Sequence, residues 1–422
     1  MKKFWIVRFF RLLLSTLFIL LCVTTDIWFP PTTADTIRRY SRPLEFDYIR
    51  WEITSIWDKL LEHAFGISYH LTVDQQRQIV KDYFRLLSRS FELEQQLTTL
   101  ISDPDFEDEK TRLKLEKDLE LLTVRLKHQS RLAEPVLQTQ LSFTIAELAI
   151  TNIHTPWPPL LYQSTPLPRQ LIISPRDTIR QEKSISLHPD ITLEEIIELE
   201  QQIEANTDYS ALVVPIGGVG TYPSMIIETN SLSNLLETAS HEWIHNHLIF
   251  RPLGLWYDAS PALRTMNETT ASIAGSEIMT TALETFYPGY FYTDLPVPGL
   301  LYARLSASPS TDAGFNFSET MYETRIQVDQ LLEQNKINQA EAFMEEQRKI
   351  FWENGYLIRK LNQAYFSFYG AYADSPYSAA GRDPVGENVR IFRAQQPNLA
   401  SFIRKMSWMR NYRQLRIAAR SF

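Results

Sequence analysis

The sequence predicts a predominantly helical α+β protein with a small sheet in its middle. Residues 44–150 and most of the chain from 232 onward carry apolar side chains at helical spacing, and no glycine lies between Ile67 and Ile150. Between these regions lie short segments rich in β-branched residues, which are typical of strands. We therefore expect α+β, predominantly α: long N-terminal helices, a small mixed sheet and a helical C-terminal half.

The composition is that of a folded protein without a nucleic-acid partner. Hydrophobic residues make up 44% of the 422 residues and charged residues 22%, which argues against disorder. The net charge of −8 is spread along the chain and gives no case for nucleic-acid binding. The single cysteine, Cys22, excludes an intramolecular disulfide, so thiol chemistry does not hold the fold together.

The N-terminus predicts a targeting segment. No acid precedes Asp26, and a mainly apolar run, residues 12–25, follows a basic flank. This order is typical of a signal anchor or of a signal peptide cleaved near Thr32–Ala34, and we favour the anchor because the apolar run extends to Phe29. The rest of the chain is then expected outside the cytosol, membrane-anchored or, after cleavage, secreted or periplasmic. The basic residues of the flank are Lys2, Lys3, Arg8 and Arg11.

Proline is dense from Pro156 to Pro168, which predicts a boundary between the first helices and the strands. A shorter Pro30-Pro31 spacer follows the targeting segment. We expect four segments: 1–34 for targeting and spacing, 35–165 as a helical region, 166–300 as the core that carries the strands and the motifs below, and 301–422 as a helical C-terminal subdomain.

Local patterns place the elements within these segments. Residues 70–150 predict a helical hairpin whose turn is the acidic stretch 102–109; it either binds a partner or caps a cleft. The glycines Gly217, Gly218 and Gly220 predict a turn or bulge between strands, because neither a phosphate loop nor a dinucleotide fingerprint is complete. The predicted strands are 171–175, 184–189, 211–218 and 222–229, with a helix at 193–205 among them.

The segment His241-Glu242-Trp243-Ile244-His245 matches the pattern HExxH. On a helix, residues four apart share a face, so both imidazoles can reach one Zn²⁺ ion. Glu242 is rotated by about 100°, which places its carboxylate beside a zinc-activated water as a general base. His247 lies on the opposite side of this helix and is expected to be structural. Candidate N-caps of the helix are Asn230, Ser231 and Ser233.

Two histidines require a third protein ligand, and Glu268 is the best candidate. Its helical neighbours on the same face are all small, so this helix can approach the histidine helix closely. Glu277 and Glu284 point to the other side of the helix. The small neighbours are Ala271, Ser272 and Gly275.

HExxH followed by Asn267-Glu268-Thr269-Thr270-Ala271 resembles the gluzincin metallopeptidases, the group of thermolysin and the zinc aminopeptidases. The resemblance covers about residues 211–280. It implies His241, His245 and Glu268 as zinc ligands and Glu242 as the base. In thermolysin-like enzymes an acid follows the third ligand by four residues, whereas Ser272 stands here, so the partner of one histidine is unassigned, with Asp258 as a candidate.

The resemblance also implies features around the metal. The strand 222–229, before the histidine helix, would be an edge strand that pairs with an extended peptide. Leu361-Asn362-Gln363-Ala364 is similar to a C-terminal helix of bacterial aminopeptidase-like proteins. An aminopeptidase also needs an acid for the substrate amine, for which Glu228 is the nearest candidate. Candidates for oxyanion stabilisation are Tyr257, Tyr287, Tyr290, Tyr365 and Tyr369.

The C-terminus is basic: no acid follows Glu387, and residues 399–417 alternate apolar and basic positions. A docked helix with a solvated basic face explains this pattern, and we favour it over a helix that lies on anionic lipid.

These patterns predict a zinc-dependent peptidase with one Zn²⁺ per chain, tethered to a membrane or exported, that acts on a peptide or protein as an aminopeptidase or an endopeptidase. Two alternatives stay open. The chain could be a non-catalytic membrane-anchored scaffold with a structural or vestigial zinc site, although an intact Glu242 argues against this. It could also be a zinc hydrolase of a non-peptide substrate.

Overall fold

A computed structural model describes residues 33–64, 70–101, 109–151, 155–289, 315–370 and 384–420. The chain forms two compact units, Met1–Arg42 and Pro43–Phe422. The described part of the first unit is essentially helix α2 (Thr33–Ser41), followed by the short 3-10 helix η1 (Arg42–Leu44) at the junction. The expected boundaries at 165 and 300 both lie inside the second unit. The predicted targeting segment lies outside the described residues, and none of the described helices is long and apolar enough to cross a membrane.

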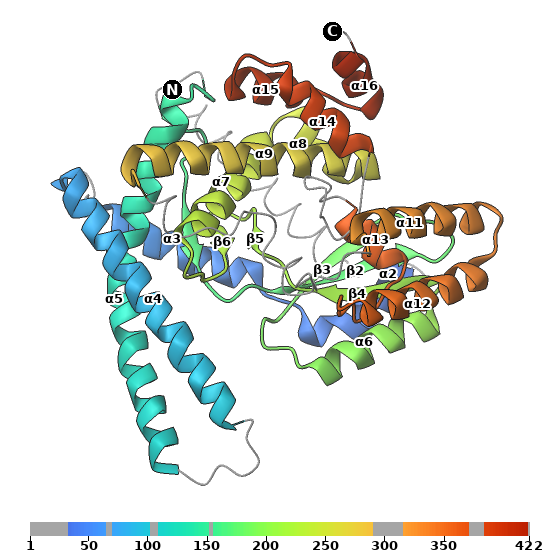
Figure 1. The fold of residues 1–422 in the computed structure, drawn as a ribbon, viewed down its shortest axis with the longest axis horizontal. Helices are drawn as coiled ribbons and strands as arrows, with labels where there is room; N and C mark the ends of the chain where they lie inside the picture. The colour runs from blue at the N-terminus through green and yellow to red at the C-terminus, as the bar shows by residue number, and fades with distance from the viewer. Residues whose placement is uncertain are drawn as a thin grey trace, which may run out of the picture. The chain divides into compact units, whose positions relative to one another are not determined.

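The second unit begins with long helices, as predicted. Helix α3 (Tyr48–Ala64) precedes α4 (Val73–Ile101) and α5 (Glu109–Glu147), and the last two lie side by side (Figure 1). The predicted turn between them falls almost wholly outside the described residues. The C-terminal half of α5 packs into the main hydrophobic core, where Val136, Leu137, Leu141 and Ile145 are fully buried.

The central strands form two three-stranded sheets. The first is antiparallel with the order β3-β2-β4, where β2 is Arg169–Pro175, β3 is Lys183–Leu187 and β4 is Tyr209–Val214. Helix α6 (Leu193–Asn206) connects β3 to β4 and begins with a capping box in which Thr192 and Glu195 satisfy each other's backbone amides. All four elements were predicted within a few residues.

The second sheet is mixed, with the order β1-β6-β5. Strand β6 (Ser224–Ile226) pairs in parallel with β1 (Tyr162–Ser164) and antiparallel with β5 (Gly218–Val219). The expectation that 222–229 is an edge strand is therefore wrong, because β6 has a partner on each side. The turn or bulge predicted at the glycines holds for Gly217 and Gly220, which lie outside strands, but Gly218 begins β5. A two-residue strand that contains glycine carries no periodic signal in the sequence.

Two helices follow the mixed sheet and pack along each other: α7 (Leu232–Leu248) and α9 (Pro261–Phe286), with the short α8 (Pro252–Leu255) and the 3-10 helix η3 (Tyr257–Ala259) between them (Figure 1). Ser231, one of the three predicted caps, accepts a hydrogen bond from the Asn234 amide. A Cβ at Gly275 would lie 3.0–3.3 Å from backbone and side-chain atoms of Glu237 and His241. The small face of α9 therefore allows the close approach that the sequence predicted.

The remaining helices cover two cores. Helices α11 (Phe317–Glu333), α12 (Ile337–Glu353) and α13 (Gln363–Tyr369) enclose a core with β2 and β4. Helices α14 (Pro384–Ala394), α15 (Leu399–Met406) and α16 (Tyr412–Arg420) pack against α9. The C-terminal helices bury apolar residues such as Phe402 and Leu415, and α15 and α16 expose their basic residues, so the docked-helix interpretation is confirmed.

Candidate metal centre

Helices α7 and α9 bring three predicted ligands together. The Nε2 atoms of His241 and His245 lie 3.0 Å apart. The Glu268 Oε2 atom lies 3.4 Å from the first and 3.5 Å from the second. The four-residue spacing puts both imidazoles on one face of α7, and Gly275 lets α9 come close enough to add its carboxylate. We call these three side chains the candidate metal centre.

The triangle of donor atoms fits a tetrahedral ion. Zinc binds nitrogen and oxygen at about 2.0–2.2 Å, so two tetrahedral ligand atoms lie about 3.4 Å apart. Glu268 is only 2% exposed, and its Oε2 accepts no hydrogen bond within the described residues. A buried carboxylate oxygen without a hydrogen bond is costly unless a cation compensates it. The donor set of two imidazoles and one carboxylate therefore suits a divalent ion such as zinc.

Hydrogen bonds behind the histidines orient their rings. The His245 Nδ1 atom lies 2.9 Å from Asn267 Oδ1, and the amide group of Asn267 donates to the Leu253 carbonyl at 3.0 Å. Because Asn267 Oδ1 can only accept, the proton on His245 Nδ1 points to Asn267, and Nε2 is the nitrogen that faces Glu268 and can bind an ion.

The partner of His241 is Ser272, whose Oγ lies 3.4 Å from His241 Nδ1. Asp258 was expected as a replacement for the missing acid, and this expectation is wrong: Asp258 is an exposed residue of η3, and Ser272 and Asn267 hold the Nδ1 positions. No role was predicted for Asn267, although it directly precedes Glu268.

Of the tyrosine candidates, Tyr257 is the one that reaches the centre. Its hydroxyl donates a short hydrogen bond to Glu268 Oε1, and the guanidinium of Arg264 donates to the same hydroxyl at 3.2 Å. Tyr287 instead donates to Gln140 at 2.8 Å, in the main core. Tyr365 and Tyr369 belong to the core beneath the antiparallel sheet, together with Asn362, the N-cap of α13; Tyr290 lies outside the described residues.

Glu242 lies between α7 and the edge strand β5. It is 6% exposed, and a Cβ at Gly218 would overlap its carboxylate. A Cβ at Gly220 would lie 3.5 Å from Glu242 Oε2 and 3.3 Å from the His245 Cβ atom. The two glycines therefore allow the backbone of this segment to pass directly over the predicted base.

Burial and charge act in opposite directions on the groups of the centre. Burial alone would raise the pKa of Glu268, but the two histidines hold it well below its usual range. Burial would lower the pKa of His245, but the neighbouring Glu268, Glu242 and Asn267 raise it to about 9. Burial raises the pKa of Glu242 despite the histidines. Burial, and then Glu268, raise the pKa of Tyr257 well above its usual value, so its hydroxyl stays protonated.

His247 is structural, as the helix geometry predicted. Its Nδ1 lies 2.9 Å from the Trp157 carbonyl oxygen, and its ring stacks on Trp243 at 5.1 Å. Burial lowers the pKa of His247 to about 4, despite the bond to Trp157, so it is neutral at physiological pH.

Two other acids considered from the sequence have partners outside the candidate metal centre. Glu277 faces away from the centre and binds both Nε and Nη2 of Arg393 at 2.7 Å. The pKa of Glu228 is raised by burial and by its neighbours Glu134 and Glu94, which places it beside α4 and α5. Within the described residues, Glu228 forms no hydrogen bond or ion pair with the candidate metal centre.

Comparisons with known proteins identified no relative of this chain. No family model matches the chain, and searches of curated proteins and of solved structures found no significant match.

Proposed function

We propose that the chain is a zinc-dependent peptidase in which His241, His245 and Glu268 hold one Zn²⁺ ion. The observation that carries this proposal is the convergence of the three donor atoms at 3.0–3.5 Å, with the buried Glu242 directly after His241 on α7. A zinc ion held there acidifies water and polarises a substrate carbonyl. A structural zinc site would have no use for Glu242.

The residues of the chain then divide the remaining tasks. Glu242 takes a proton from the attacking water and delivers it to the leaving amine, and its raised pKa suits both directions of transfer. Asn267 and Ser272 orient the histidines, and Tyr257 fixes one oxygen of Glu268 so that the other faces the ion.

The edge strand β5 is the candidate substrate strand, in place of β6. Its segment passes over Glu242, and extended peptides pair with exposed strand edges through their backbone groups. The proposal retains a membrane-tethered or exported location, which rests on the N-terminal sequence alone.

The test is zinc content and peptide hydrolysis of the purified full-length chain, measured alongside Glu242→Gln. We expect about one zinc per chain in both proteins and a loss of hydrolysis of at least about 100-fold in the variant. Peptides with free and with blocked amino groups distinguish an aminopeptidase from an endopeptidase.

Glu277→Gln is the matched control, because it neutralises a glutamate on the opposite face of α9 and should keep zinc and activity. Absence of zinc from the unmodified chain, or full activity of Glu242→Gln, would refute the proposal.

A further inference from the structure

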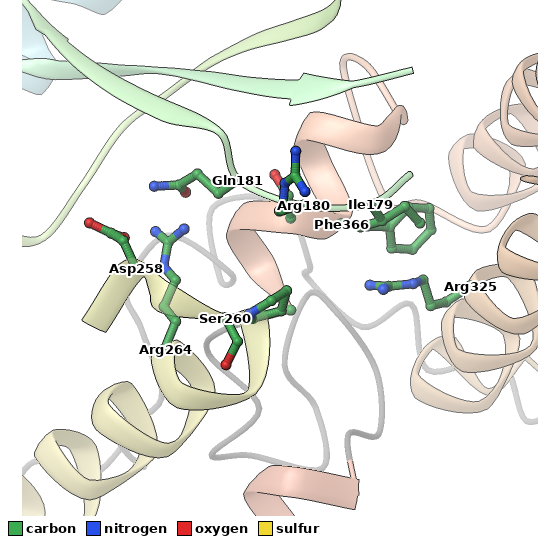
Figure 2. A pocket seen from close by; sticks show the side chains of 11 residues that line it. Ile179, Arg180, Gln181, Asp258, Ser260, Arg264, Arg325 and Phe366 are labelled. Atoms are coloured by element: carbon green, nitrogen blue, oxygen red, sulfur yellow. The ribbon is translucent and has the colours of Figure 1, made fainter. Parts of the chain in front are cut away.

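A pocket lies at the N-terminus of α9 (Figure 2). Its cavity volume is about 50 Å³, which suits a small group such as a carboxylate and not a whole ligand. Its lining includes Arg180, Arg264 and Arg325 but a single acid, Asp258, so the described lining carries a formal charge of +2 (three positive, one negative). The helix N-terminus at Ser260 adds partial positive charge.

Arg264 connects this pocket to the candidate metal centre. It precedes Glu268 by four residues on α9, so the two side chains share a face about 6 Å apart along the axis. Its Nε donates to the Tyr257 hydroxyl, which in turn donates to Glu268. Its guanidinium lies 5.4 Å from the Tyr257 ring centre and 5.9 Å from that of Phe368, and the residue is 6% exposed. A buried positive charge is thus held in place beside the candidate metal centre.

The other two arginines approach from different elements. Arg325 of α11 lies over the Phe366 ring at 5.7 Å and uses its Nε for Asp329, and Figure 2 shows its guanidinium pointing across the pocket. Arg180 follows β2 and pairs with the partly exposed Glu182. A guanidinium has five N–H donors, so these pairs leave donors for a further ligand. Such surface pairs also contribute little energy by themselves.

We propose that this pocket binds a carboxylate of the substrate. Arg264 lies about 6 Å from Glu268 along the α9 axis, a separation that about two residues of an extended peptide span. Guanidinium groups bind carboxylates through paired hydrogen bonds. Asp258 in the lining favours a singly charged group over a dianion. The carboxylate comes from the peptide's C-terminus or from an Asp or Glu side chain.

This inference rests on the proposed peptidase function, and its test uses binding so that the two can fail separately. The Glu242→Gln protein is titrated, by fluorescence anisotropy, with one N-terminally labelled pentapeptide in three forms: free C-terminal acid, C-terminal amide, and amide with Glu as the last residue. We expect at least one carboxylate form to bind at least about 10-fold more tightly than the plain amide. The tighter form identifies the source of the carboxylate.

Arg325→Gln and Arg264→Gln, each added to Glu242→Gln, should reduce this discrimination to less than about 3-fold. Arg89→Gln is the control, because it removes one arginine charge from an exposed pair on α4. Arg264 is buried and its variant must be shown to fold, whereas Arg325 is partly exposed and keeps the test valid if that variant does not.

Equal binding of the three peptides, no measurable binding of either carboxylate form, or unchanged discrimination in Arg325→Gln would overturn the carboxylate pocket. If the chain with Glu242 intact still contains zinc and hydrolyses peptides, only the pocket proposal fails. A chain without zinc or hydrolysis refutes the proposed function, whatever the peptides show.

Discussion

Glu200 of α6 and Glu268 of α9 are both 2% exposed, yet the protein surrounds them in opposite ways. Glu200, beside the antiparallel sheet, accepts hydrogen bonds from the Arg359 guanidinium at 2.6 and 2.9 Å and from the Val213 amide at 2.7 Å. Glu268 receives the Tyr257 hydroxyl at one oxygen, while its other oxygen faces two imidazoles at 3.4 and 3.5 Å.

The two acids differ in which groups compensate their buried charge. A buried charge is costly unless the protein or a ligand pairs with it. At Glu200 the chain itself supplies hydrogen-bond donors and a countercharge. These bonds join α6, β4 and the segment before α13. At Glu268 the pairing is left incomplete in a way that a cation completes. Burial of an acid by itself therefore does not indicate a metal site, whereas a buried carboxylate oxygen that faces two imidazoles is typical of one.

Of these substitutions, Glu268→Gln should have the largest effect, which is on zinc affinity. Removal of the only charged donor of the candidate metal centre should lower zinc affinity at least about 100-fold, as measured by competition with a fluorescent chelator. Glu277→Gln on the same helix should leave the affinity unchanged. Zinc affinity of Glu268→Gln within 3-fold of the unmodified chain would contradict the assignment of this ligand.

Glu200→Gln should act on stability alone. It leaves Arg359 and Lys360, whose side chains are 36% and 26% exposed, without their full countercharge. Because water reaches both cations, we expect the free energy of unfolding to fall by roughly 2 kcal/mol, below the value for a wholly buried pair. Urea unfolding measures this change, and zinc content should be retained. If Glu200→Gln lost zinc at unchanged stability, Glu200 and not Glu268 would be the acid linked to the metal.

Asn267→Ala tests a residue that does not bind the ion but contacts a predicted ligand. Without the Asn267 acceptor, His245 loses the bond that fixes its proton on Nδ1, and zinc affinity should fall about 10-fold. The same chelator competition measures it. Asn388→Ala, which removes an amide from α14 far along the chain, serves as control. An unchanged affinity would show that Asn267 does not orient this ring.

Thr192→Ala should have the smallest effect, on the helix that carries Glu200. It removes the N-cap of α6 and should cost about 1 kcal/mol of stability without affecting zinc content. Bonds from the Thr192 backbone and hydroxyl lower the pKa of Glu195, so the carboxylate's contribution is present above its ordinary pKa and is lost as pH falls through the lowered pKa. The stability gap between the two proteins, followed by thermal unfolding, should therefore narrow in acid; a constant gap would argue against the capping box.

Features encoded over short stretches were predictable. The helical class, the strands β2, β3 and β4, the helix α6 and its neighbours follow from periodicity and turn residues. The candidate metal centre followed from spacing: four residues between His241 and His245, and small residues around Glu268. Each of these signals is complete within one helix or strand.

Features that depend on pairing between distant segments were not predictable. The central place of β6 requires β1, about 60 residues earlier, and a two-residue β5. Tyr257 was one of several candidates until η3 placed it against Glu268. The role of Gly218 depends on Glu242, which lies on a different element.

The sequence by itself determined the helical α+β class, the helix that carries HExxH, and the choice of Glu268, because 3.6-residue periodicity and side-chain size act locally. Only the tertiary structure decided which strand lies beside Glu242, which groups orient the histidines, and that three arginines from separate elements line one pocket. These depend on close packing between segments far apart in the chain, where a single Cβ at Gly218 or Gly275 would change the approach.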